Sequence, residues 1–463
     1  MNDAPSWLRS FIESFMAVTL TSGPLPVIAY ALAVAGIAVL VVWQLLRDDR
    51  RRMIGQLAIA LCAGALGLLA AWLVSDGIMV FGVSLGWAVI VTVAVGFAAL
   101  GFLVATAIQA HHMRRAIAII LVPIALIATA VRVDTIYGEY QTIGSLVNYS
   151  PYQSIGATSL GNDTITVAEW QRRAARHTLP NDLPTRGSLY TQRIANTRSR
   201  FQARDAMVYL PPAALSSTPP RLPVLILLAG QPGSPSRAMS ASGIVALLDD
   251  YAAAHDGLAP IVVSPDQNGD NTINSLCADT TKHGKAETYL TRDVPDWIRG
   301  HLPVSTDAKD WAIAGFSQGG TCSTQLAPRH PDLFGTMIAV DGEIAPTDGS
   351  VEHMVDAYFG GDRAAYESQV PTNAIAAHSP SDQAAVLAAG EHDTTSVANV
   401  RTIGAAARKA GMDVTTLEVP GTGHDWHAVH ATLEAALPWW CARTGLGTTD
   451  KTWSDYTALQ VIR

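Results

Sequence analysis

The segment 311–320 carries the residues best suited to chemistry in this chain. Its sequence, Trp-Ala-Ile-Ala-Gly-Phe-Ser-Gln-Gly-Gly, leads from apolar residues into Gly315-x-Ser317-x-Gly319. The apolar residues indicate a short buried strand, and the run after the serine can form a helix that ends before Pro328. A sharp turn between the two would project the serine hydroxyl, and small residues on both sides of it prevent backbone clashes. Ser317 is therefore the candidate nucleophile.

This strand, turn and helix resemble the nucleophile elbow of the α/β-hydrolases. A serine hydroxyl needs a base to remove its proton. We predict that His424 is that base, because it lies in a glycine-rich loop between the last predicted strand and the last long helix, where such enzymes present their histidine. His427 and His430, on the following helix, are weaker alternatives.

The acid that orients the histidine should lie between Ser317 and His424, because α/β-hydrolases order their triad as serine, acid and histidine. The apolar strand predicted at 384–389 is followed by Gly390 and, three residues later, by Asp393. We predict that Asp393 is this acid, and it is also placed to cap the following helix. The alternatives are Glu391 on the same loop and Asp341 and Glu343 after the preceding strand.

The tetrahedral intermediate of acyl transfer requires backbone N–H donors. One is expected from Gln318, directly after the nucleophile, and the other from Gln231, because the neighbouring Pro232 has no N–H. The sequence contains no metal-ligand spacing and no glycine loop that would hold a phosphate, so we predict neither a metal nor another cofactor.

Strands and helices alternate through the second half of the chain, which predicts a mostly parallel sheet covered on both faces. Strand signals begin near residue 189. Further strands are predicted at 201–210, 222–228, 261–264, 311–314, 337–341, 384–389 and 415–419, and helices at 242–255, 287–302, 397–410 and 427–437.

The first part of the chain predicts a membrane bundle. Uncharged apolar runs long enough to cross a bilayer occupy 25–46, 54–74, 85–109 and 116–131. Soluble helices of this length would carry polar stripes, which these lack. The segment 7–20 before them has two interpretations, an amphipathic helix at the membrane surface or an irregular terminus.

The arginines of the loops predict the orientation. Arg47 and Arg50–Arg52 lie between the first two spans, Arg114 and Arg115 lie between the last two, and the loop 75–84 has neither lysine nor arginine. The positive-inside rule makes the two basic loops cytoplasmic, so both termini are expected outside the cytoplasmic membrane. We therefore predict a membrane domain at 1–133, a connector at 134–186, a hydrolase domain at 187–446 and a tail at 447–463.

Charge and cysteine content agree with this location. The net charge of -8 argues against a nucleic-acid partner. Cys277 and Cys322 both follow predicted strands at the carboxyl edge of the sheet, so we favour a disulfide between them over two buried thiols. Cys62 and Cys441 have no evident partner in the sequence.

The region 187–446 resembles the esterase-D-like and antigen-85-type mycolyltransferase branch of the α/β-hydrolases. The matching segments are Val208-Tyr-Leu-Pro-Pro212, Pro265-Asp-Gln267, Gly315-Phe-Ser-Gln-Gly319, His330-Pro-Asp-Leu-Phe334 and Gly423-His-Asp-Trp426. The resemblance implies serine-dependent chemistry on acyl esters, with Ser317, Asp393 and His424 as the triad. A trehalose-binding stretch is not found in 231–239, and the mycolyltransferases use a glutamate as their acid, so an esterase is favoured.

These observations together predict a membrane-anchored, extracytoplasmic serine esterase. Its substrate is expected to be an acyl or aminoacyl ester, such as a lipid of the cell envelope. The alternatives are an acyltransferase that uses the same triad and a membrane scaffold without catalytic activity. The sequence predicts no oligomeric state.

Overall fold

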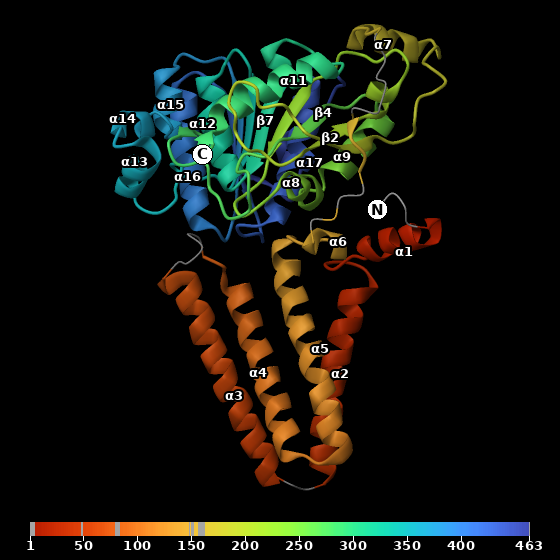
Figure 1. Cartoon of the computed structure of the whole chain (residues 1–463), viewed down its shortest axis with the longest axis vertical. Coiled ribbons are helices and arrows are strands. Elements are labelled where there is room, and N and C mark those ends of the chain that lie inside the picture. Colours follow the sequence, from red (N-terminus) through yellow and green to blue (C-terminus); the bar gives the residue numbers. More distant parts are fainter. Residues whose placement is uncertain are drawn as a thin grey trace. The chain divides into compact units, whose positions relative to one another are not determined.

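A computed structural model describes residues 5–47, 50–78, 84–147, 149, 152–155 and 163–462. It divides the chain into two compact units, Met1–Tyr149 and Ser150–Arg463 (Figure 1). Residues 79–83 of the loop between the second and third spans lie outside the described residues, as do 148, 150, 151 and 156–162 of the predicted connector.

The first unit is helical. It consists of α1 (Ser6–Met16), α2 (Pro24–Leu46), α3 (Arg50–Trp72), α4 (Trp87–Gln109), α5 (His112–Tyr137) and α6 (Ile143–Leu146). Four of these helices, α2 to α5, are long and apolar enough to cross a membrane, with α3 continued to Gly77. Each matches one of the apolar runs predicted to span the bilayer, although α4 begins two residues after its predicted start. Helix α5 continues through Pro123 well beyond its predicted ends.

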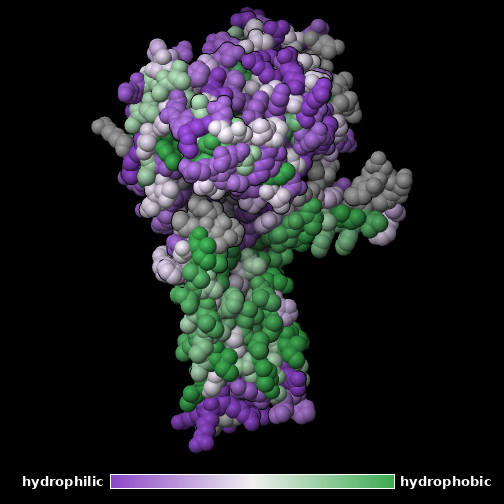
Figure 2. All heavy atoms as spheres, turned by 60° about the vertical axis from the view of Figure 1, so that its left-hand side comes forward, coloured by the Kyte–Doolittle hydropathy of each residue, from purple (hydrophilic) through white to green (hydrophobic). Residues whose placement is uncertain are grey.

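Small residues let α3 and α4 approach each other closely. A Cβ atom added to Gly101 of α4 would lie 2.7 Å from the Cβ of Ala63, and one added to Gly67 of α3 would lie 2.7 Å from the Cβ of Phe97. Close backbone packing of this kind is typical of helices in lipid, where apolar burial alone does not drive association. The outer surface of the bundle is strongly apolar (Figure 2).

Helix α1 has one aromatic face. Trp7, Phe11 and Phe15 are 69%, 64% and 49% exposed and are spaced four residues apart, which places them on one stripe of the helix. The backbone after α1 is fixed to the segment before α6, because Leu20 N–H donates to Gln141 O at 2.9 Å. Of the two interpretations of this segment, the structure agrees with the amphipathic helix and not with the irregular terminus.

The second unit is built on a nine-stranded sheet with the order β1-β2-β4-β3-β7-β8-β9-β10-β11. Its strands are β1 (Ser188–Gln192), β2 (Ala206–Leu210), β3 (Val224–Leu228), β4 (Ile261–Ser264), β7 (Trp311–Phe316), β8 (Thr336–Val340), β9 (Ala384–Gly390), β10 (Asp413–Val419) and β11 (Gln460–Val461). The six central strands of this order, β4, β3, β7, β8, β9 and β10, are parallel. Strands β1, β2 and β11 run antiparallel to their neighbours. A separate two-stranded sheet pairs β5 (Asp279–Thr280) with β6 (Gly284–Lys285).

Helices cover both faces of the large sheet (Figure 1). Along β3, Val224, Ile226 and Leu228 pack in the core shared with α11, α12, α15 and α16, whereas Leu225 and Leu227 pack in the core shared with α8, α9 and α17. The helices of this unit are α7 (Val167–Ala175), α8 (Pro235–Ala241), α9 (Ile244–Ala254), α10 (Ala286–Thr288), α11 (Val294–His301), α12 (Gln318–Arg329), α13 (Val351–Phe359), α14 (Arg363–Glu367), α15 (Pro371–Ala377), α16 (Thr394–Lys409) and α17 (Trp426–Arg443). This is the α/β-hydrolase arrangement that the alternation of strands and helices predicted.

Several boundaries differ from the expected ones, including the start of β2 at Ala206 and the end of α17 at Arg443. Helix α12 does not end before Pro328 but continues to Arg329, because a proline in the last turn removes only one hydrogen bond of the helix. The segment predicted as a C-terminal tail ends in β11, which adds an edge strand beside β10.

Candidate active site

Ser317 lies in a strained turn between β7 and α12. Its backbone has φ 54° and ψ -119°, a conformation that is uncommon for a residue with a side chain. The Ser317 N–H donates to Val340 O of the adjacent strand at 2.9 Å, which holds the turn in place. Glycine is required nearby, because a Cβ atom on Gly319 would lie 2.6 Å from the carbonyl oxygen of Ala229. The local sequence therefore produces the sharp turn between strand and helix that it predicted, with Ser317 partly buried.

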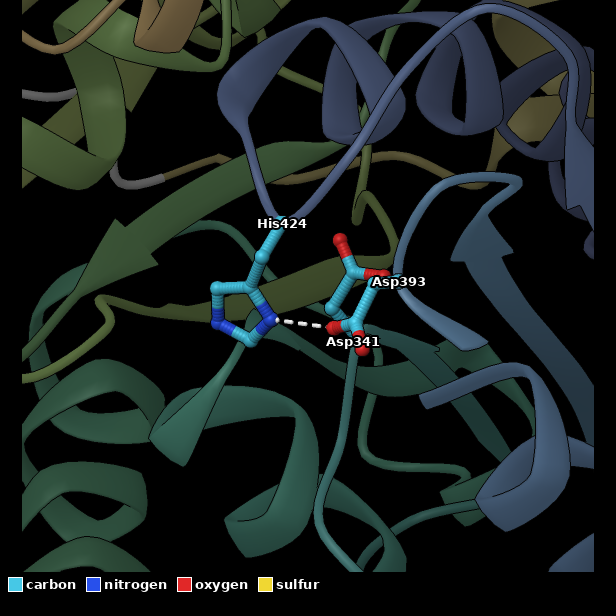
Figure 3. A group of neighbouring side chains, drawn as sticks. All are labelled: Asp341, Asp393 and His424. Atoms are coloured by element: carbon cyan, nitrogen blue, oxygen red, sulfur yellow. Dashed lines mark hydrogen bonds and ion pairs between the residues drawn. The ribbon is translucent and has the colours of Figure 1, made fainter. Parts of the chain in front are cut away.

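His424 and Asp393 are brought together from two loops. His424 lies after β10, Asp393 lies after β9, and the Nδ1 atom of the histidine is 2.7 Å from Oδ2 of the aspartate (Figure 3). A carboxylate only accepts hydrogen bonds, so Nδ1 carries the proton and Nε2 is left as the basic nitrogen. The second oxygen of Asp393 accepts the N–H of Ser396 at 3.1 Å, so the residue also caps α16.

Burial strengthens the interaction between these two side chains. The side chains of His424 and Asp393 are 11% and 10% exposed. Burial lowers the pKa of His424, but the hydrogen bond to Asp393 and the charges of Asp341 and Asp393 outweigh it, so the pKa is raised above its usual value. Burial raises the pKa of Asp393, but the hydrogen bond and charge of His424 prevail and lower it. The pair is therefore stabilised in its charged form.

Phe316 links the serine turn to the histidine loop. Its ring centre is 5.0 Å from that of His424 and 4.7 Å from that of Trp426. The hydroxyl of the adjacent Ser317 makes no hydrogen bond within the described part of the chain. Phe316 therefore brings the serine turn towards an imidazole whose Nδ1 atom is fixed by a carboxylate, a combination that serves general-base activation of a serine.

The other candidate residues have different contacts. Glu391 accepts the N–H of Gly421 at 2.8 Å and so shapes the loop that carries His424. The Nδ1 atom of His430 lies 3.0 Å from the carbonyl oxygen of Ser242. Asp341 accepts the N–H of Gly390 at 2.9 Å and lies beside the pair of His424 and Asp393.

One ligand-type atom from each of Asp341, Asp393 and His424 lies within 4.8 Å of the others, a set of donors that metal ions also use. The Nδ1 atom of His424 is already engaged with Asp393, however. This contact favours proton transfer by the imidazole over metal binding at the same atoms.

The two residues predicted to stabilise an oxyanion both lie in segments next to Ser317. Gln318 begins α12, so its backbone N–H has no acceptor within the helix. The loop of Gln231 passes beside the serine, because a Cβ atom added to Gly230 would lie 3.4 Å from the Cβ of Ser317. The role of the Gln231 N–H stays a prediction.

The loop after β4 contacts the segments of both of these residues. The sequence analysis did not identify this supporting role. Gln267 donates its side-chain amide to Ala229 O at 2.6 Å, beside the loop of Gln231. Asn268 exchanges two hydrogen bonds with the Gln318 side chain, at 2.8 and 2.9 Å, and Asn274 accepts a third at 2.6 Å. The cluster of amides directly after a predicted strand was the available signal.

Two anchors fix this loop. Arg204 makes hydrogen bonds to both oxygens of the buried Asp266, at 2.8 and 2.9 Å. At the other end of the loop, Cys277 forms a disulfide with Cys322 in α12. The predicted pairing is therefore present in the structure, and it connects the loop to the helix that begins at the nucleophile.

Comparisons with known proteins place the chain in a family. A model of the Esterase family, described as "Putative esterase", matches residues 201–440. An uncharacterized protein of Corynebacterium glutamicum is 32% identical over 336 residues, which cover 70% of this chain and 76% of that protein.

Two solved structures are among those similar to this chain. An S-formylglutathione hydrolase from Agrobacterium tumefaciens is 19% identical, with 57% of this chain and 97% of that chain covered and a TM-score of 0.47. MPT51 (FbpC1) of Mycobacterium tuberculosis is 18% identical, with 54% and 94% covered and a TM-score of 0.39. Since the family model spans more than half of the sequence, the chain belongs to the Esterase family and is a carboxylic ester hydrolase.

Proposed function

We propose that this protein is a membrane-anchored serine esterase whose catalytic domain lies outside the cytoplasmic membrane. The observation that carries the proposal is the buried hydrogen bond between His424 and Asp393 beside the strained turn of Ser317. Ser317 would act as the nucleophile, His424 as the base and Asp393 as the acid that fixes the histidine, the three roles of a catalytic triad.

The reaction follows from the protonation states. Ser317 Oγ attacks the ester carbonyl while His424 Nε2 takes its proton, and Asp393 stabilises the resulting imidazolium. The backbone N–H groups of Gln318 and Gln231 stabilise the negative oxygen. The imidazolium then donates its proton to the departing alkoxide, which leaves an acyl-enzyme. A water molecule, deprotonated by His424, releases the acid and restores the serine.

The predicted membrane topology supports an ester of the cell envelope as substrate. Four candidate spans precede the hydrolase domain, and the disulfide between Cys277 and Cys322 suits an oxidising compartment. An enzyme anchored in this way reaches lipids or envelope polymers more readily than solutes of the cytoplasm. The substrate class is therefore an acyl or aminoacyl ester, with a lipid of the envelope as the favoured carrier.

Helix α1 supports the attachment to the membrane. The exposed stripe of Trp7, Phe11 and Phe15 is continuous along the chain with the apolar helix α2. Aromatic side chains are enriched at the boundary between lipid and water, and amphipathic helices bind there with the apolar face inward. We infer that α1 lies in this boundary.

Labelling with a fluorophosphonate tests the proposal. The full chain in detergent should be labelled at Ser317, and Ser317→Ala should abolish labelling, whereas Ser454→Ala, at an exposed serine far along the sequence, should not change it. Product analysis with an activated ester in the presence of glycerol then separates hydrolysis from transfer to a hydroxyl. A folded protein that neither takes the probe nor cleaves the ester would show that the proposal is wrong.

A further inference from the structure

Asp341 is a buried carboxyl that the proposed reaction does not use. It follows β8 directly, its residue is 0% exposed, and its Oδ1 atom accepts the N–H of Gly390 at 2.9 Å. Its Oδ2 atom is buried and has no hydrogen-bond partner within the described residues. Burial of a polar atom without a partner is costly and calls for a reason beyond the bond to Gly390.

The sheet places this carboxyl next to the catalytic pair. Strands β8 and β9 are parallel neighbours, with Val340 opposite Ala388, so the residues after them meet at one edge of the sheet. Asp341 and Asp393 therefore approach His424 together, with one ligand-type atom of each of the three residues within 4.8 Å of the others (Figure 3).

The backbone of Asp341 is also unusual. Its φ is 50°, in the left-handed region that residues with a side chain seldom adopt. Strained backbone conformations persist where the surrounding structure enforces them, and they gather at functional sites. Here the conformation belongs to a residue whose carboxyl lies beside the imidazole.

We propose that Asp341 is a second acid for His424, a positioning residue that holds the imidazolium when the carboxylate of Asp393 is absent. The inference rests on the proposed function. Each acyl step forms an imidazolium, and a nearby carboxylate attracts it strongly in a buried site, where water does not screen the charges. The bond from Gly390 engages Oδ1, so Oδ2 is the oxygen that remains available to interact with an imidazolium.

A purely structural role makes a different prediction. If Asp341 only accepts the Gly390 N–H, then Asp341→Asn retains that acceptor and should affect activity by the same factor in every background. A second acid should instead matter most when Asp393 is gone. A double-mutant cycle measures this difference, because independent sites contribute additively.

The cycle compares the full chain with Asp341→Asn, Asp393→Ala and the double variant, each assayed for kcat on an activated ester. We expect Asp341→Asn alone to lower kcat less than about threefold, and to lower it at least about tenfold further in the Asp393→Ala background. Thermal unfolding serves as the control for folding. If Asp341→Asn does not fold, Asp341→Ser, with a smaller polar side chain and no charge, replaces it in the cycle.

Two results would overturn the second acid while leaving the esterase intact. One is an equal factor for Asp341→Asn in both backgrounds. The other is an Asp393→Ala variant with no more activity than Ser317→Ala, which would leave nothing for Asp341 to support. Failure of the proposed function looks different, because the unmodified protein would then show no fluorophosphonate labelling at Ser317.

Discussion

Gln267 donates a 2.6 Å hydrogen bond to the carbonyl oxygen of Ala229. Asn268, in the same loop, forms a hydrogen bond with the side chain of Gln318. One loop therefore contacts the segments that carry both predicted oxyanion donors. The positions of the N–H donors determine how well the transition state is stabilised. The loop after β4 is accordingly part of the machinery that shapes the site.

We expect Gln267→Leu to lower kcat by roughly tenfold with little change in KM, because a shifted donor loses contact mainly in the transition state. Steady-state kinetics on an activated ester measures both constants. Gln202→Leu, at an exposed glutamine, is the matched control and should leave both unchanged. An unchanged kcat in Gln267→Leu would mean that the bond to Ala229 O has no influence on the oxyanion site.

The stability of the hydrolase domain should fall as the pH rises from 5 to 8. Burial raises the pKa of Asp341 to about 7 and that of Glu343 to about 7, so between pH 4 and 7 the folded state binds more protons than the unfolded state. The raised pKa of His424 acts in the same direction, since its stabilising charge is lost as the pH rises through the folded pKa. Asp393, with a lowered pKa, affects stability only at more acidic pH.

Thermal unfolding at a series of pH values checks this. In Asp341→Asn, Tm should depend less on pH than in the unmodified protein. The fall in Tm between pH 5 and pH 8 should be smaller by about 3 °C or more. Glu391→Gln is the control, because its carboxyl lies on an exposed part of the loop. A profile of Asp341→Asn parallel to that of the unmodified protein would show that Asp341 does not titrate in this range.

The loop positions of Ser317, His424 and Asp393 were predictable because each depends on a local pattern. Gly315-x-Ser317-x-Gly319 specifies its own turn, and the loops of Asp393 and His424 each follow an apolar strand in the order that the fold requires. The four apolar helices were equally clear, since length and composition alone define them.

The supporting polar network could not be predicted in the same way. The contacts of Gln267 and Asn268 join residues 38 and 50 positions apart, and no periodicity in the sequence reports such pairs. The proximity of Asp341 to Asp393 likewise depends on the pairing of β8 with β9. The helices α13 to α15 are short, so they too were missed.

The proposed topology makes opposite predictions for two loops. In a Cys62→Ser background, a thiol reagent that cannot cross membranes should label Asp76→Cys in intact cells but not Arg51→Cys, because the arginine-rich loops are expected to be cytoplasmic. Both positions are exposed in the structure. Labelling after membrane permeabilisation is the control, and it should reach both. Labelling of Arg51→Cys alone in intact cells would reverse the orientation.

The aromatic face of α1 should be immersed in the membrane boundary. Phe11 lies on the exposed aromatic stripe, while the neighbouring Ser10 points to another side of the helix, since adjacent residues are about 100° apart. In nanodiscs and a Cys62→Ser background, a spin label at Phe11→Cys should therefore relax more with oxygen than with a water-soluble nickel chelate, because oxygen concentrates in lipid. A label at Ser10→Cys should show the opposite preference. If both labels respond mainly to the nickel chelate, α1 lies in water. If both are shielded from the two reagents, a protein surface covers the helix, and in either case the boundary location is wrong.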